Sequence, residues 1–387
     1  MPDGSEQPII KLVGRIHDVD ADAWDACAGS DNPFLSHAFL KALEESRSVG
    51  HRTGWQPRHM IVEEPRGRIV AAAPMYLKAH SYGEYVFDYG WADAYERAGG
   101  RYYPKLLVAV PFTPVPGPRL LVRPGPEAEA VRATLAAGLI AAAEQLGVSS
   151  VHVNFVGETD AATLAASGFM LRRGLQYHWH NRGFTSFDDF LASLSSRKRK
   201  AIRKERQAVA DQGIRVVPVT GGDLKSRHWD AFFRFYMDTG SRKWGRPYLT
   251  REFFDLIGAT LADRIVLMMA ERDGDLVGGA LNLIGSDALY GRNWGCLGNY
   301  PFLHFEACYY RAIEFAIERR LARVEAGAQG EHKIQRGYLP VETTSAHWIA
   351  DPNFAAAVAD FLERETHAVR EEGRALAEFS PFRKERG

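Results

Sequence analysis

The chain has 387 residues, with 48 Lys and Arg balanced by 48 Asp and Glu. This length favours two domains, and the balanced charge excludes an overall field that would select nucleic acid or an anionic membrane. The three cysteines show no CxxC spacing and cannot form a closed set of disulfides, which favours a reducing compartment. The start of the chain is polar and acidic, and the longest apolar stretch, 133–143, is too short to span a bilayer. We therefore expect a cytoplasmic protein without stable membrane insertion.

The first half of the chain predicts alternating strands and helices. Strands are expected at 9–16, 58–63, 69–77, 150–155 and 169–180, and helices at 21–28, 37–46, 127–146 and 159–166. Ser36 is a favourable N-cap for the second of these helices. The region 82–91 is rich in Tyr and Gly, and the proline-rich segment 111–118 excludes a helix or a central strand. Because the proline-rich segment also contains Phe and Val, we expect it to be an ordered loop.

The second half of the chain also predicts a series of helices and strands. Helices are expected at 187–212, 229–238, 251–260, 307–321 and 353–372, and strands at 265–272, 276–284, 289–294, 323–326 and 345–349. The similar order of elements suggests an internal structural repeat, although the two halves share no recognisable sequence identity.

Two polar clusters follow neighbouring strands of the second half. One is 324–333, where a short apolar run breaks into glycines and then into Gln, Glu, His and Lys. The other is 289–306, a glycine-containing loop before an amphipathic helix. The order strand, loop, helix, strand, polar loop places backbone N–H groups at one junction and indicates an anion site. It is neither a Walker loop nor a GxGxxG fingerprint, and the alternative is a polar loop with solvated charges.

A basic run at 197–206 is the strongest concentration of charge. Apolar residues at helical spacing beside it predict an amphipathic helix. The run is either a solvated helix face or a site for an anionic partner, such as cofactor phosphates, a lipid head group or RNA.

Several motifs in both halves resemble those of the bacterial FemAB-like family of predicted N-acyltransferases. The motifs are 81–88, 111–115, 195–206, 243–245, 248–250, 279–282, 290–292, 304–306 and 325–333. The resemblance implies an α/β (α+β) fold of two tandem domains of the GCN5-related acetyltransferase type, each a mixed, largely antiparallel sheet flanked by helices. We place these domains at 8–183 and 184–380, with the probable active site in the second, where the titratable clusters concentrate.

The resemblance further implies transfer of an acyl or aminoacyl group to an amine, in a cell-wall (peptidoglycan) precursor or a small metabolite. Relatives in the wider group use aminoacyl-tRNA, and other members of the fold use acyl-CoA. The usual acyl-CoA loop, Gln/Arg-x-x-Gly-x-Gly/Ala, is replaced here by 295–299. The residues expected to bind the donor or cofactor are Gly295, Gly298, Asn299, Arg199 and Arg203.

N-acyl transfer needs a base for the ammonium and donors for the carbonyl oxygen. The candidate bases are Glu306, Glu331, His304 and His332, with Glu331 or His332 preferred. The candidate groups for binding a carbonyl or the substrate are Arg292, Trp294, Gln329, Lys333, Lys243, Trp244, Asp88 and Tyr89. Capping of a turn is the alternative role for Asp88, and core packing is the alternative for the aromatic side chains.

Two other functions use the same residues. His304, Glu306, Glu331 and His332 would form a zinc or iron site, but they lack an HExxH spacing, and we expect no metal. Alternatively, two degenerate acyltransferase domains would form a non-catalytic module that binds a glycopeptide, a lipid or RNA, with the basic helix as its anchor.

Overall fold

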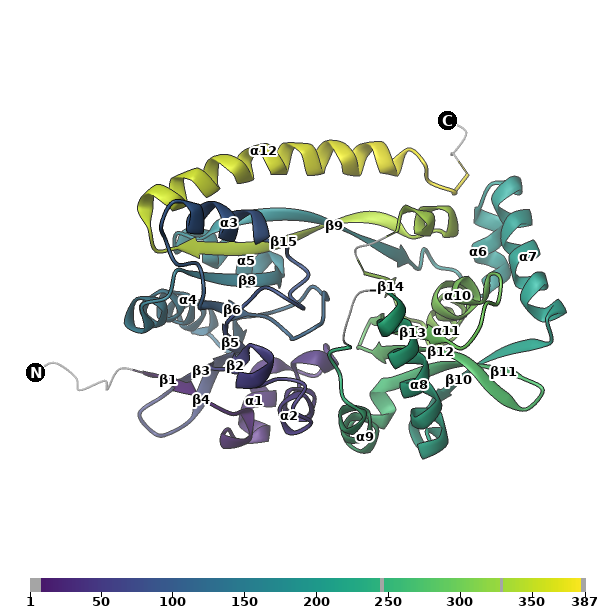
Figure 1. The fold of residues 1–387 in the computed structure, drawn as a ribbon, viewed down its shortest axis with the longest axis horizontal. Coiled ribbons are helices and arrows are strands. Elements are labelled where there is room, and N and C mark those ends of the chain that lie inside the picture. The colour runs from purple at the N-terminus through teal and green to yellow at the C-terminus, as the bar shows by residue number, and fades with distance from the viewer. Residues whose placement is uncertain (1–7, 244–246, 328–329, 384–387) are drawn as a thin grey trace, which may run out of the picture. The chain divides into compact units, whose positions relative to one another are not determined.

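The computed structural model describes residues 8–243, 247–327 and 330–383 (Figure 1). The chain forms two compact units that are interleaved along the sequence. The first unit contains the residues up to Gly174 and Thr343–Val369, and the second contains Leu175–Glu342 and the residues from Arg370 onward. The predicted ranges, 8–183 and 184–380, are contiguous and therefore differ from these units. Ala346 and Leu362 are buried in the cores of the first unit, and this burial of apolar side chains assigns the late segment to it.

The first unit contains two groups of strands. β1 (Ile9–Val13), β3 (His59–Glu63), β4 (Ile69–Ala73) and β7 (Leu121–Val122) form an antiparallel sheet in the order β1-β3-β4-β7. The other group is the later part of β15 (Leu339–Ile349), β8 (Ser150–Val156), β6 (Lys105–Val108), β5 (Met75–Lys78) and β2 (Trp55–Pro57), in that order. In it β6 and β8 are parallel, and the other neighbours are antiparallel.

Helices cover these strands. They are α1 (Ala21–Ala28), α2 (His37–Glu45), α3 (Tyr89–Arg97), α4 (Ala128–Leu146), α5 (Glu158–Ala166) and the first part of α12 (Pro352–Ala377). α4 buries Leu135, Leu139 and Ala143, which are four residues apart and therefore share one helix face, in the core that also contains β4 and β8.

The second unit contains a sheet in the order β10-β11-β12-β13-β14-β9. Its strands are β10 (Ile214–Thr220), β11 (Ile265–Arg272), β12 (Asp275–Ile284), β13 (Ala288–Cys296), β14 (Arg323–Glu325) and the later part of β9 (Met170–His180). Neighbouring strands are antiparallel except for β13 and β14, which are parallel.

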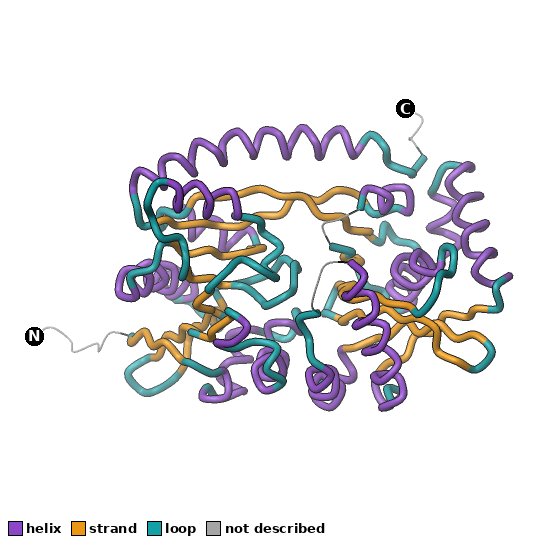
Figure 2. The backbone as a smooth tube through the Cα atoms, in the orientation of Figure 1, coloured by secondary structure: helices purple, strands orange, loops and turns teal. Residues whose placement is uncertain are grey.

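Helices cover both faces of this sheet. They are α6 (Phe187–Ser193), α7 (Ser196–Asp211), α8 (Ser226–Lys243), α9 (Arg251–Thr260), α10 (Leu303–Phe305), a π-helix (Glu306–Tyr310), α11 (Arg311–Glu318) and a 3-10 helix (Glu331–Arg336). Successive strand residues point to opposite faces. Gly279 and Gly295 face α8, which runs across the strands (Figures 1 and 2). Ala280 instead belongs to the buried core that also contains Ile313 of α11 and Ile202 of α7.

Both units are thus mixed, largely antiparallel sheets flanked by helices, and this confirms the predicted α/β architecture. The helices α1 and α9 have the predicted bounds, and the Ser36 hydroxyl accepts a hydrogen bond from Phe39 N (3.3 Å) as the expected N-cap. Across the part of the chain that the structure describes, no helix combines the length and the apolar composition needed to cross a bilayer.

Other predicted elements are wrong. The single helix at 187–212 is two helices, because Leu194 is extended and its backbone bridges to Phe382. The strand at 69–77 is broken at Pro74, which lacks the N–H that a continuous ladder requires. The sequence pattern does not predict β6, β10 or α3.

Gly295 allows β13 to pack directly on α8. A Cβ at this position would lie 2.2 Å from the carbonyl oxygen of Phe235. Gly295→Ala is therefore expected to lower the free energy of unfolding by about 1–3 kcal/mol, since a strand or a helix must shift to accept the methyl group. Urea unfolding measures this change. Gly222→Ala is the control, because a Cβ there meets nothing within 4 Å. Equal stabilities of the two variants would contradict the close packing.

Candidate functional site

A cavity opens in the sheet of the second unit where β13 and β14 diverge. The two strands pair from Ala288 with Arg323 to Tyr290 with Glu325. β14 then ends, whereas β13 continues to Cys296. The cavity has a volume of about 430 Å³. Its lining residues are Ala280, Leu281, Asn282, Gly291, Arg292, Asn293, Trp294, His304, Cys308, Tyr309, Ala326, Gly330, His332 and Lys333.

A β-bulge places Arg292 at the cavity. In the ladder of β12 and β13, Leu281 pairs with Asn293 and the adjacent Asn282 pairs with Gly291. Arg292 is therefore the extra residue on β13. Bulges redirect side chains and occur frequently beside active sites.

The first unit has a parallel pair at the equivalent place, but its own chain fills the position beyond it. β6 and β8 pair from Leu106 with Val151 to Val108 with Val153. The loop after β6 then returns, so that Gly117 N donates to Phe155 O (3.0 Å) and Gly157 N donates to Gly117 O (3.1 Å). This is the proline-rich segment that the sequence predicts to be ordered.

The helical segment after β13 presents different side chains to the cavity and to α7. Its π-helix, Glu306–Tyr310, has a rare geometry that is frequently found at functional sites. His304, Cys308 and Tyr309 line the cavity. Glu306 instead accepts hydrogen bonds from Arg206 of α7, with Nη2 to Oε1 at 2.9 Å and Nε to Oε2 at 3.0 Å.

His332 is well placed to accept a proton in the cavity. Its Nε2 lies 3.1 Å from the Tyr309 hydroxyl, which donates to it when Nε2 is unprotonated. The His332 side chain is partly exposed, and its partial desolvation, together with the positive charges of Arg336 and Lys333, lowers its pKa from 6.5. Burial also raises the pKa of Tyr309, so the phenol keeps its proton. A neutral imidazole is thus held beside a hydroxyl donor, as a general base requires.

Lys333 and Arg292 give the lining a positive charge. Lys333 Nζ donates to the carbonyl oxygens of Ala326 (2.5 Å) and Gly327 (3.3 Å), and burial lowers its pKa to about 8. The cavity lining that the structure describes contains neither Asp nor Glu. Such a lining suits a carbonyl oxygen or an anionic group.

Five predicted site residues therefore meet in this cavity: Arg292, Trp294, His304, His332 and Lys333. Two of the four candidate bases do not line it. Glu306 is paired with Arg206, and Glu331 is exposed at the start of the 3-10 helix. The four side chains considered for a metal site are thus separated, since the two histidines line the cavity and the two glutamates do not. Within the described ranges, no group of three or more His, Cys, Asp and Glu side chains is arranged to hold a metal ion.

The residues predicted to bind a cofactor lie elsewhere in the second unit. Gly295 is buried under α8, and Gly298 and Asn299 are in an exposed turn. Arg199 and Arg203 are on α7, where Arg203 Nη2 lies 3.4 Å from Asp188 Oδ1. Gln329, Trp244 and the side chain of Lys243 lie outside the described residues.

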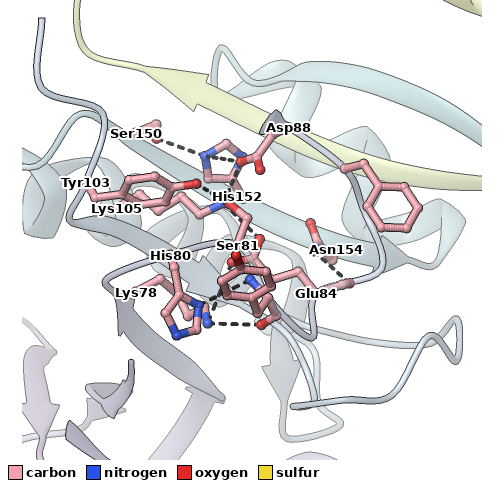
Figure 3. A network of polar contacts seen from close by, with 12 residues as sticks. Lys78, His80, Ser81, Glu84, Asp88, Tyr103, Lys105, Ser150, His152 and Asn154 are labelled. Carbon is pink, nitrogen blue, oxygen red and sulfur yellow. Dashed lines mark hydrogen bonds and ion pairs between the residues drawn. The ribbon is translucent and has the colours of Figure 1, made fainter. Parts of the chain in front are cut away.

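Asp88 belongs to a buried ion-pair network in the first unit, which Figure 3 shows. Lys105 Nζ donates to Ser81 Oγ (2.7 Å), Glu84 Oε2 (2.8 Å) and Asp88 Oδ2 (2.5 Å). Burial alone would raise the pKa of Asp88, but the Lys105 ammonium holds it well below its usual value. The carboxylate makes no capping hydrogen bond to α3, so the capping alternative is wrong. Tyr89 follows it with an exposed side chain.

A second lysine completes this network. Lys78 is fully buried, with its Nζ 3.8 Å from Glu84 Oε1 (Figure 3). The same Nζ lies 3.7 Å from the centre of the Trp55 ring. Burial lowers the pKa of Lys78 to about 7. His152 is neutral, since burial and the Lys105 charge lower its pKa to about 3. The network fixes the loop between β5 and α3, whose Tyr82 and Phe87 rings are exposed.

The sequence did not indicate Tyr309, Lys78 or Lys105. A 3.6-residue period assigns Tyr310 to the buried side of its helix, and nothing in the pattern marks the π-helix that turns Tyr309 toward the cavity. For the two lysines the sequence contains one weak indication of a buried position, because each directly adjoins an apolar strand segment.

The comparison with protein families gives one match over nearly the whole chain. The model of the FemAB-like family, described as peptidoglycan biosynthesis/recognition, matches residues 15–384. Among curated proteins, no sequence matches this chain.

Solved structures share the fold at low sequence identity. The structure of L-PGS from Bacillus licheniformis has a TM-score of 0.51 at 11% identity, over 86% of this chain and 98% of that chain. FemX has a TM-score of 0.56 at 11% identity, over 88% and 98%. The C-terminal domain of a putative lysylphosphatidylglycerol synthetase from Agrobacterium fabrum has a TM-score of 0.56 at 9% identity, over 90% and 96%. These similarities show a shared fold, in agreement with the two mixed, largely antiparallel sheets flanked by helices.

Lys78 is expected to make stability depend on pH. Its pKa is about 7 in the folded protein and 10.5 as the reference for an exposed lysine, so the unfolded chain binds this proton more tightly. The contribution of Lys78 to the free energy of unfolding therefore increases from pH 7 to 10.5, by at most about 1.4 kcal/mol per pH unit. Urea unfolding of wild type and Lys78→Met across this range should show a difference that shifts in favour of wild type as the pH rises. The matched control is Lys11→Met, at an exposed lysine of the same unit. A pH-independent difference for Lys78→Met would mean that its pKa is not lowered.

Proposed function

Because the chain belongs to the FemAB-like family, we propose that it is an N-acyltransferase whose second unit transfers an acyl or aminoacyl group to an amine. The observation that carries this proposal is the cavity between β13 and β14. There the imidazole of His332 and the hydroxyl of Tyr309 lie beside the cationic Arg292 and Lys333.

The chemistry needs one base and one carbonyl-binding group. The amine nitrogen forms a bond to the acyl carbon, the C–S bond of a thioester or the C–O bond of an ester breaks, and the leaving group takes up a proton. His332 accepts the proton of the substrate ammonium, directly or through the Tyr309 hydroxyl. Within the described residues, Lys333 donates to the carbonyl oxygens of Ala326 and Gly327, and its third N–H binds the substrate carbonyl oxygen as negative charge develops there.

The donor is an acyl-CoA or an aminoacyl-tRNA. The positive lining supports a donor with phosphate groups near the cavity mouth. The family description, peptidoglycan biosynthesis/recognition, supports an acceptor amine in a cell-wall precursor. Trp294, which lines the same cavity, provides an aromatic surface for a planar or apolar part of either substrate.

Thermal stabilisation identifies the donor. The purified protein is heated with acetyl-CoA, a longer acyl-CoA, free CoA or charged tRNA, because a ligand that binds only the folded state raises the melting temperature. The stabilising donor is then incubated with amine acceptors, and the amide product is measured by mass spectrometry. A product supports the proposal. Stabilisation by tRNA or a glycopeptide without any transfer would instead favour the non-catalytic binding module.

His332→Gln should decrease kcat/KM about 10²–10⁴-fold, the usual contribution of a general base. Because the pKa of His332 is below 6.5, the wild-type rate should remain constant from neutral pH to below 6.5 and then fall as the imidazole is protonated. The pH dependence of kcat/KM with a saturating second substrate measures both effects. His367→Gln, an exposed histidine on α12, is the control and should behave as wild type. An active His332→Gln enzyme with an unchanged profile would exclude His332 as the base.

A further inference from the structure

The helix α7 contacts the back of the candidate site through the side of the helix that faces the protein. Its outer side exposes the basic residues Arg197, Lys200, Arg203 and Lys204. Ile202 and Val209 are buried in the core of the second unit, and Glu205 and Arg206 lie at the boundary between these two sides. The two boundary residues contact the two segments that carry the cavity side chains.

Glu205 binds the 3-10 helix that carries His332. Arg336 Nη2 donates to Glu205 Oε1 (2.8 Å) and Oε2 (2.9 Å), and the Tyr310 hydroxyl donates to the same carboxylate. Arg336 Nη1 in turn donates to the backbone carbonyl oxygen of His332 (2.8 Å). One carboxylate of α7 is thus connected, through a single arginine, to the main chain of the candidate base.

The same arginine also touches the helical segment on the other side of the cavity. Its guanidinium lies 3.5 Å from the centre of the Phe305 ring, whose centre is 5.6 Å from that of His332. Phe305 and Tyr309 are stacked. Arg336 therefore bridges the two segments that provide the two partners of the hydrogen bond between Tyr309 and His332.

A purely structural ion pair would not need this arrangement. Buried ion pairs contribute little net stability compared with apolar packing, because the charges must be removed from water. Arg336 is buried, and its N–H groups donate to the Glu205 carboxylate and to the backbone carbonyl oxygen of His332, which lines the cavity. A planar guanidinium fixes the direction of both bonds, which an ammonium cannot do.

We propose that Glu205 and Arg336 are positioning residues that hold His332 against Tyr309. The proposal rests on the proposed function only for its effect on rate, and the geometry of the pair can be measured without turnover. Glu205 and Arg336 do not contact the substrate in this scheme. They fix the main chain of His332, and through it the direction of the imidazole.

The experiment uses Glu205→Gln and Arg336→Lys in the full chain. Glu205→Gln removes the charged partner at nearly constant shape, and Arg336→Lys keeps the positive charge near His332 but removes the planar fork. Asp230→Asn is the matched control. It also removes a carboxylate paired with an arginine of the second unit, Arg251, with Nη2 to Oδ1 at 2.7 Å, and it does not line the cavity.

The first readout is the His332 imidazole, followed by NMR with labelled histidine. In the wild-type background, Tyr309→Phe should shift the His332 resonances, because it removes the hydroxyl that lies 3.1 Å from Nε2. In the Glu205→Gln and Arg336→Lys backgrounds, the same change should have little effect, since the two side chains no longer meet. The control background should preserve the wild-type response. A full response in all backgrounds would overturn the proposal.

The second readout is kinetic. Both variants should lower kcat by on the order of 10²-fold with little change in the KM for the donor, because a misdirected base impairs the reaction more than binding. Arg336→Lys should keep the low pKa of His332 in the pH profile, whereas Arg336→Gln should raise it, since the Arg336 charge is one of its causes. Wild-type kcat in folded Glu205→Gln and Arg336→Lys would also overturn the positioning role.

The two readouts separate this proposal from the proposed function. If no donor gives an amide product, the acyltransferase function fails, while the NMR response still decides whether Glu205 and Arg336 position His332. If Glu205→Gln does not fold, Arg336→Lys provides the same NMR comparison. Circular dichroism and melting temperature establish folding in each case.

Discussion

The short parallel pairing of β13 with β14 is the constraint on which the candidate site depends. The strands separate after Tyr290 and Glu325, whereas β13 remains paired with β12 as far as Cys296. A rigid strand therefore forms one wall of the cavity, and the segments that leave the sheet form the others. Because β13 is held on its other edge, the bulged Arg292 keeps its direction toward the opening.

The helical segment after β13 divides its side chains between two environments. His304 and Tyr309 line a cavity without described carboxylates. Burial keeps the Tyr309 phenol protonated, and partial burial together with nearby positive charge lowers the pKa of the His332 imidazole. Glu306 and Tyr310 contact α7 instead. The π-helix makes this division possible, because its wider turn changes which residues share a face. This one segment thus provides both the hydroxyl beside His332 and the contacts to α7.

The two units both contain a parallel strand pair, but they differ in whether the chain itself fills the position beyond that pair. In the first, the loop after β6 returns to hydrogen-bond beside β8, so the chain occupies the position of the second unit's cavity. Its charged groups, Lys105 with Glu84 and Asp88, are buried and paired, and they fix a loop with exposed aromatic rings. Ionisable groups alone therefore do not identify a site. Those of this network are buried among one another, whereas Arg292, His332 and Lys333 of the second unit line a cavity.

Sequence patterns alone predict the order of strands and helix from β11 to β14, and they thereby place Arg292, His304, His332 and Lys333 at one junction. Hydrophobic periodicity and glycine positions are local properties, so they predict elements and the ends at which loops gather. Three features instead follow from the three-dimensional packing: Glu306 turns to α7, Glu205 reaches Arg336, and residues 343–369 join the first unit. These outcomes depend on a π-helix, on a side-chain network and on the burial of distant segments. Each is set by packing between residues far apart in the chain, which a local pattern does not contain.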